Sequence, residues 1–315
     1  MVVRKFNYYR FFIVLIILIV IIFGITSFIK DKNYKKTYEY KLTNIGYSIE
    51  DVNKIEKELS SNQIDKILTM KYYDNLVDLI SEKYFIFDYL EEYINYKNEN
   101  KKKSNAEIVK MVNTKSYLDW FDNQYETDIT KNELMLVNRY YGLSEDYEPD
   151  DIVDVPTQYA YSGKKISKSI LDKIISLINA GKQEGFTFVV SDGYRSYKEQ
   201  ENIYNNYVDS YGMSQTDEIV ARPGHSEYQT GLSFDLKPYN QVIEDVSTNS
   251  EYLWLKDNAY KYGFIFRFEK EHESVTQFPS SSWRLRYVGD SAASLIYSEK
   301  ISFEEYYAFF VENNN

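Results

Sequence analysis

One segment of the chain, residues 221–235, combines residue types and a spacing that are typical of a metal site. Asp235 supplies a carboxylate, which is a common zinc ligand, and it follows Tyr228 by seven residues. A tight Pro223-Gly224 turn leads into the segment, and an apolar stretch ends it. The layout suits a zinc hydrolase, except that Tyr228 stands where a histidine ligand would be expected. The chemistry of the site therefore depends on what else the chain offers.

The amino-acid composition limits the classes of partner and the kinds of metal site that the chain could have. The formal net charge of −11 argues against a nucleic-acid partner, which would require a basic surface. The absence of cysteine excludes disulfides and cysteine-based zinc sites. Only two histidines occur, His225 and His272. The expected setting of each is a solvated or hydrogen-bonded position at the surface.

Residues 11–29 form an apolar run without a charged side chain, and its length suits one membrane crossing. Arg4, Lys5 and Arg10 precede the run, which favours a cytoplasmic N-terminus over residues 1–10. The alternative is a cleaved signal peptide. The run is long for the apolar part of a signal peptide, and no Ala-x-Ala site follows it. We therefore expect a single-pass anchor in the cell membrane, with the C-terminal part of the chain outside the cytoplasm.

Residues 30–111 have the pattern of a small all-helical spacer. Ser48 with Asp51 forms a candidate capping box, and Ser104 is a candidate helix cap. Apolar residues recur at helical spacing in several short segments. The expected helices cover residues 48–59, 61–68, 76–80, 85–96 and 104–112.

From residue 112 to 315 the pattern changes to intermixed strands and helices. Expected strands are 186–190, 232–236, 264–268 and 283–288, and expected helices are 166–181, 197–211, 252–262, 290–297 and 302–310. These elements do not alternate regularly, which favours α+β over α/β. We expect a small mixed or antiparallel sheet flanked by helices, preceded by the transmembrane helix and the helical region.

Five ordered segments of this second region match a known pattern. They are LMLVNRYYGLSEDYEPDDIV (134–153), SDGYRSYKEQ (191–200), RPGHSEYQTGLSFDL (222–236), NAYKYGFIFRF (258–268) and SSSWRLRYVG (280–289). Together they resemble the VanY-type D-alanyl-D-alanine carboxypeptidases, zinc peptidases that trim peptidoglycan stem peptides. Five motifs in one order carry far more weight than any one of them.

The resemblance also shows which of the family's metal ligands and catalytic groups are replaced in this chain. In the family, two histidines and an aspartate hold the metal and a glutamate is the general base. These roles fall on Tyr228, Arg284, Asp235 and Ser281 respectively, and of these only Asp235 keeps a competent group. Arg284 would repel a divalent cation and pair with Asp235, while Ser281 cannot accept a proton near neutral pH. We therefore expect a vacated metal site, filled by an Arg284–Asp235 ion pair.

Other family positions are retained. Arg195 matches the arginine that helps to hold the substrate, although it could also cap the following helix or pair with Asp192. The remaining candidate substrate-binding residues are Tyr194, Ser196, Gln200 and Ser226.

The resemblance and the substitutions together predict a membrane-anchored, catalytically inactive carboxypeptidase-like protein. Its expected partner is a peptidoglycan stem peptide or a wall enzyme, and no cofactor is expected. One alternative is an active metallo-carboxypeptidase that removes the terminal D-Ala. Its zinc site would be rearranged around His225, Asp235 and Glu227 or His272. The other alternative is a structural or partner-binding scaffold.

Overall fold

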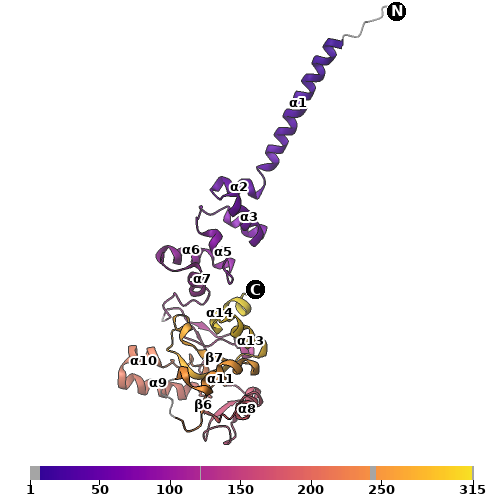
Figure 1. The fold of residues 1–315 in the computed structure, drawn as a ribbon. Helices are drawn as coiled ribbons and strands as arrows, with labels where there is room; N and C mark the ends of the chain where they lie inside the picture. The colour runs from indigo at the N-terminus through magenta and orange to yellow at the C-terminus, as the bar shows by residue number, and fades with distance from the viewer. Residues whose placement is uncertain (1–7, 121, 242–245, 314–315) are drawn as a thin grey trace, which may run out of the picture. The chain divides into compact units, whose positions relative to one another are not determined.

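The computed structural model describes residues 8–120, 122–241 and 246–313 (Figure 1). The chain divides into two compact units, Met1–Phe87 and Asp88–Asn315. The helices that follow residue 88 therefore pack with the C-terminal unit. The expected domain limits, 30–111 and 112–315, stay a prediction.

The first unit consists of helices. The apolar run forms α1 (Tyr8–Tyr34), in which no residue of the stretch Phe11–Tyr34 is buried within the protein. Four short helices follow: α2 (Tyr38–Ile45), α3 (Ile49–Glu58), α4 (Ser61–Ile67) and α5 (Leu76–Ile80). The capping box expected at the start of α3 is present between Ser48 and Asp51, and it orients Val52 and Ile55 into a buried position.

The second unit begins near a 3-10 turn, η1 (Phe87–Tyr89), followed by α6 (Leu90–Glu99) and α7 (Asn105–Asn113). Ser104 forms a capping box with Glu107 at the start of α7, as its position predicts. The helix expected over residues 85–96 is wrong at its start, because the 3-10 turn occupies its first part.

A four-stranded sheet forms the centre of the second unit. Its order is β5-β6-β8-β7, and every neighbouring pair is antiparallel. The strands are β5 (Phe188–Asp192), β6 (Ser233–Pro238), β7 (Phe264–Phe268) and β8 (Ser281–Tyr287). Two further pairs are small: β1 (Tyr125–Glu126) with β2 (Tyr141–Gly142), and β3 (Ile152–Asp154) with β4 (Lys165–Ser167). The expected α+β class is confirmed.

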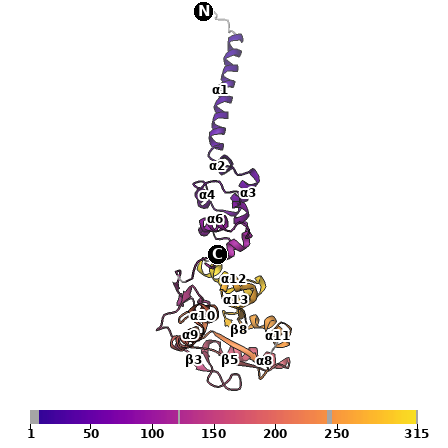
Figure 2. The ribbon, with the colours of Figure 1, turned by 90° about the vertical axis from the view of Figure 1, so that its left-hand side faces the viewer.

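Helices surround this sheet. They are α8 (Lys168–Gln183), α9 (Tyr197–Tyr211), α10 (Met213–Ile219), α11 (Ser250–Asn258), α12 (Glu273–Thr276), α13 (Asp290–Glu299) and α14 (Phe303–Tyr306). Short turns η2 (Ile129–Leu134), η3 (Glu227–Thr230), η4 (Val246–Thr248), η5 (Ala259–Tyr262) and η6 (Lys270–His272) join them, and a π-helix, η7 (Tyr307–Glu312), continues α14. Helices α9 and α10 lie side by side in both views (Figures 1 and 2).

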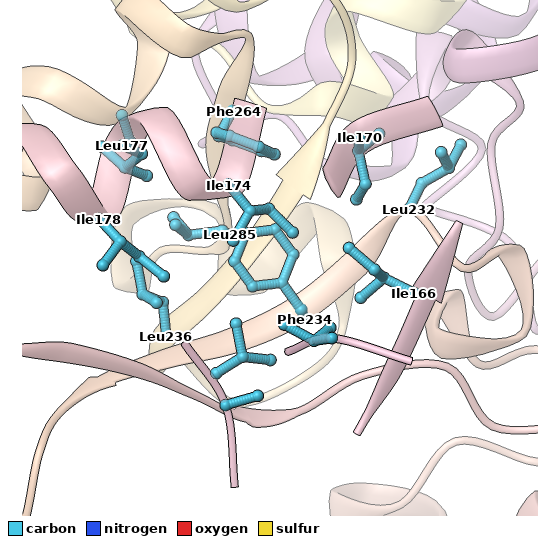
Figure 3. Close-up of a cluster of buried hydrophobic side chains, with 14 of the residues drawn as sticks. Ile166, Ile170, Ile174, Leu177, Ile178, Leu232, Phe234, Leu236, Phe264 and Leu285 are labelled. Carbon is cyan, nitrogen blue, oxygen red and sulfur yellow. The ribbon is translucent and has the colours of Figure 1, made fainter. Parts of the chain in front are cut away.

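The main core lies between α8 and one face of the sheet (Figure 3). Ile170, Ile174 and Leu177 follow helical spacing on α8, and they face Phe234 of β6 across the core. Ile166 continues the same apolar spacing backwards, which is why the sequence predicts a helix from residue 166. In the structure Ile166 belongs to β4 and pairs with Val153, so the helix begins only after the Ser167 cap.

The register between β6 and β8 sorts their side chains onto two faces. Successive side chains of a strand point to opposite faces of the sheet. Phe234 and Leu285 are direct partners and belong to the core. Asp235 and Arg284 are also direct partners and lie on the other face. The sheet therefore separates an apolar core from a polar site.

Candidate functional site

The position of the expected metal site holds a closed triangle of side chains. Arg284 donates from Nε to Asp235 Oδ1 at 3.0 Å and from Nη2 to the Tyr228 hydroxyl at 2.5 Å. The Tyr228 hydroxyl in turn donates to Asp235 Oδ1 at 2.8 Å. Tyr228 lies on η3, Asp235 on β6 and Arg284 on β8. The structure thus contains the expected Arg284–Asp235 ion pair, with Tyr228 as its third member.

The protonation states of the triangle follow from burial and charge. Burial raises the pKa of the Tyr228 phenol above its ordinary value, so the hydroxyl stays neutral. Burial alone would lower the pKa of Arg284, but Tyr228 and Asp235 outweigh it and the pKa lies above the usual value. The guanidinium is therefore a permanent cation at this position.

This donor set does not fit a zinc ion. A catalytic zinc site needs about three protein ligands and an open position for water. Here a neutral phenol and a cation stand beside the single carboxylate of Asp235. Over residues 8–120, 122–241 and 246–313, no group of three histidine, aspartate or glutamate side chains is placed to hold a metal ion.

Arg195 reaches the triangle from the turn between β5 and α9. Its guanidinium lies over the Tyr228 ring at 4.2 Å from the ring centroid, and that of Arg284 lies over the same ring at 4.3 Å. Arg195 also forms an ion pair with Asp192 and donates to Gln200 Oε1 at 3.3 Å. Pairing with Asp192, one of the roles expected for Arg195, is therefore present together with the contact to the site.

The other retained residues support this turn. Gln200 is buried and donates to the carbonyl of Ala221 at 2.7 Å. Ser196 is the N-cap of α9 and forms a capping box with Glu199, which engages its hydroxyl in the helix. Burial and the nearby Glu148 raise the pKa of Tyr194 to about 12. These contacts give the residues positioning roles around Arg195.

A cavity of about 220 Å³ lies beside the triangle. Its walls are Val137, Asn138, Ile219, Ala221, His225, Ser226, Glu227, Tyr228, Phe268, Phe278, Pro279, Ser280, Ser281 and Arg284. The structure thus brings together Tyr228, Ser281 and Arg284 with one of the predicted substrate-binding residues, Ser226. Tyr194, Arg195, Ser196 and Gln200 are not part of this wall. The residues of the cavity come from segments far apart in the chain, and most had no signal in the sequence.

The two histidines lie in different environments. The predicted surface position is wrong for His272. His272 is buried, with Nδ1 3.9 Å from Glu305 Oε2. His225 lines the cavity, and its Nδ1 lies 2.8 Å from the carbonyl oxygen of Asn138. Its ring packs so closely on Gly142 that a Cβ there would lie 2.8 Å from the ring. Burial lowers the pKa of His225, so the ring is neutral near pH 7.

A buried ionic cluster behind the cavity was not anticipated from the sequence. Arg267 donates to Glu227 at 2.6 Å and to Glu304 at 2.6 and 3.1 Å, and Arg286 donates to Glu227 at 3.1 Å. All four side chains are at most 3% exposed. The cluster ties η3 to β7 and β8 and so holds the backbone that carries Tyr228. The one available signal was a charge inside an apolar strand, as in FIFRF at 264–268.

Comparisons with known proteins agree with this arrangement. The D-alanyl-D-alanine carboxypeptidase (VanY) family model matches residues 163–290. The chain is 36% identical over 216 residues to the putative carboxypeptidase YodJ of Bacillus subtilis, which covers 63% of this chain and 79% of that relative. This chain belongs to the VanY family.

Two further VanY-type relatives support the assignment. A D-alanyl-D-alanine carboxypeptidase of Enterococcus faecalis is 31% identical over 182 residues, covering 55% of this chain and 65% of the relative. The structure of the LD-carboxypeptidase LdcB matches with a TM-score of 0.56 and 36% identity, covering 60% of this chain and 91% of LdcB. The protein is therefore related to the peptidoglycan carboxypeptidases in both sequence and fold.

Proposed function

We propose that this chain is a membrane-anchored VanY-family protein that binds peptidoglycan stem peptides outside the cytoplasmic membrane without hydrolysing them. The observation that carries the proposal is the triangle of Arg284, Asp235 and Tyr228. It fills the position at which the family holds its metal, and it satisfies Asp235 with a protein cation. A metal ion bound to that carboxylate would lie beside a guanidinium cation that is already paired with it, and the two positive charges would repel each other.

The loss of hydrolysis follows from the groups that the reaction requires. In metallopeptidases the metal lowers the pKa of a bound water and polarises the scissile carbonyl. A general base then accepts a proton, and efficient bases have a pKa near the working pH. Ser281, at the position of the family glutamate, has no such group. The site thus lacks both the metal ligands and the base.

Stem-peptide binding is supported by the family residues that this chain keeps and by the cavity beside them. The Arg195 turn keeps the family sequence, and its contacts to Asp192 and Gln200 hold it against the site. The cavity beside Arg284 is open and carries several polar groups. The structural report on LdcB describes peptidoglycan recognition by that protein. The apolar helix α1 supports placement at the membrane.

The test uses the full chain in lipid nanodiscs with synthetic stem pentapeptide and tetrapeptide. Binding is measured by calorimetry, and release of D-Ala is measured by mass spectrometry, with added zinc and with chelator. We expect saturable binding and no release in either condition. Release that chelator abolishes would select the active enzyme with a rearranged metal site. The absence of both binding and release would select the scaffold.

A further inference from the structure

Arg284 presents unused hydrogen-bond donors to the cavity. A guanidinium has five N–H groups. The bonds to Asp235 and Tyr228 use the Nε hydrogen and one hydrogen on Nη2. Within the part of the chain that the structure describes, Nη1 has no bonded partner. The side chain is 26% exposed and forms part of the cavity wall, so these donors can meet a ligand.

The charged groups around the triangle are paired. Arg284 pairs with Asp235, and Arg195 pairs with Asp192. Glu227 also belongs to the cavity wall, but its carboxylate pairs with Arg267 and Arg286. Arg267 pairs with Glu304 as well, so this cluster holds two positive and two negative charges. Because the carboxylates near Arg284 are already paired, its remaining donors are available to a ligand that accepts hydrogen bonds, and an anion accepts them most strongly.

The cavity is small for a whole peptide. Pockets that enclose drug-sized ligands measure roughly 300–1,000 Å³, whereas this one measures about 220 Å³. The end of a peptide fits such a space better than its middle. Two serine side chains, Ser280 and Ser281, belong to the wall near Arg284 and carry hydroxyl groups.

We propose that the cavity is a receptor for the C-terminal carboxylate of a stem peptide, with Arg284 as the residue that recognises it. This inference rests on the proposed function and specifies its ligand. A guanidinium cannot activate water as a metal does, but its planar fork matches a carboxylate through two parallel hydrogen bonds. The substitution of a metal ligand by arginine thus converts a site for cleaving an amide into a site that binds the free acid.

The test compares two forms of one peptide on the full chain in nanodiscs. The probes are a stem tetrapeptide as the free acid and the same tetrapeptide as its C-terminal amide. We expect the free acid to bind about 10- to 100-fold more tightly, the range expected for a hydrogen bond to a charged group. The comparison needs no variant, so it does not depend on whether a mutant folds.

A double variant then assigns the recognition to Arg284. Arg284→Gln with Asp235→Asn removes both charges together and leaves no unpaired carboxylate. We expect it to bind acid and amide within about twofold of each other, since the charged contact is gone. Lys198→Gln, on the exposed surface of α9, is the matched control and should keep the full difference.

The possible outcomes separate the two proposals. Equal affinity for acid and amide on the unmodified chain would overturn the carboxylate receptor and leave stem-peptide binding intact. No binding of either form would remove both proposals. A folded double variant that still prefers the acid would show that another residue recognises the carboxylate.

Discussion

At the scale of single residues, Arg284 joins Asp235 and Tyr228 through one planar group. A bound metal holds its ligands through several bonds from one point, and the guanidinium does the same for Asp235 and Tyr228. Its planar group also stacks on the Tyr228 ring, as does Arg195. A lysine would offer a point charge without the fork or the stacking surface. Arginine therefore holds Asp235 and Tyr228 together in a way that lysine could not.

The first prediction reverses the substitutions. Tyr228→His, Ser281→Glu and Arg284→His together restore the family ligands and base around Asp235, so we expect the variant to bind one zinc ion per chain. Metal analysis and calorimetry of the purified full chain would measure this. Tyr228→His alone should bind none stoichiometrically, because Arg284 still pairs with Asp235. A folded triple variant without zinc would mean that the groups orienting the ligands have also changed.

At the scale of elements, the site depends on how η3 is fixed to the sheet. Tyr228 lies on this short turn, and a short turn has little internal structure of its own. The adjacent Glu227 accepts hydrogen bonds from Arg267 of β7 and Arg286 of β8. A fully buried charge is tolerated only when it is paired and hydrogen-bonded. The cluster thus fixes the position of Tyr228 relative to β7 and β8.

The second prediction concerns this cluster. Glu227→Gln should lower the free energy of unfolding by about 3–5 kcal/mol, because it leaves the buried Arg286 without a counter-charge and leaves Arg267 with Glu304 alone. Urea denaturation of the full chain in detergent, followed by tyrosine and tryptophan fluorescence, would measure the change.

Lys198→Gln is the comparison for this measurement. It removes one member of the exposed pair Lys198–Glu201 on α9. The expected change is within about 1 kcal/mol, as for most surface ion pairs. A similar small change for Glu227→Gln would contradict the role assigned to the cluster.

At the scale of the whole molecule, α1 is the element that could place the protein at a membrane. The stretch Phe11–Tyr34 contains an 18-residue window with a mean hydropathy of 3.2, and none of its residues is buried in the protein. Such a surface needs a lipid environment, because large exposed apolar areas are unfavourable in water. Its length and composition fit either an anchor or a signal segment. The family's link to peptidoglycan favours a site on the outer side of the membrane.

The third prediction follows from the anchor. The full chain should stay in the membrane fraction after a carbonate wash, and a chain that begins at residue 36 should be released. Protease added to intact protoplasts should digest the C-terminal unit. Recovery of a soluble mature chain that begins beyond residue 30 would instead identify the segment as a cleaved signal.

Local signals in the sequence predicted many elements well. Helix α9 and strand β7 have the expected bounds, 197–211 and 264–268. The capping box of Ser196 and Glu199 marks the start of α9, and Gly212 with φ 80° marks its end. The predicted start of α8 at residue 166 was wrong. Ile166 fits the helical spacing, but it pairs with Val153, which lies 13 residues earlier in the sequence. Periodicity cannot report such a pairing.

The sequence by itself determined the family and the α+β class, because motif order and residue type are local properties. The loss of the metal ligands stays a prediction from the sequence. The sequence also predicted the pairing of Arg284 with Asp235, because the family resemblance places both residues at one site and their charges are opposite. Only the tertiary structure decided that Tyr228 joins that pair and that two guanidinium groups stack on its ring. It also decided that four buried charges hold the turn. These features depend on strand register and on contacts between residues far apart in the chain, where burial sets the strength of each interaction.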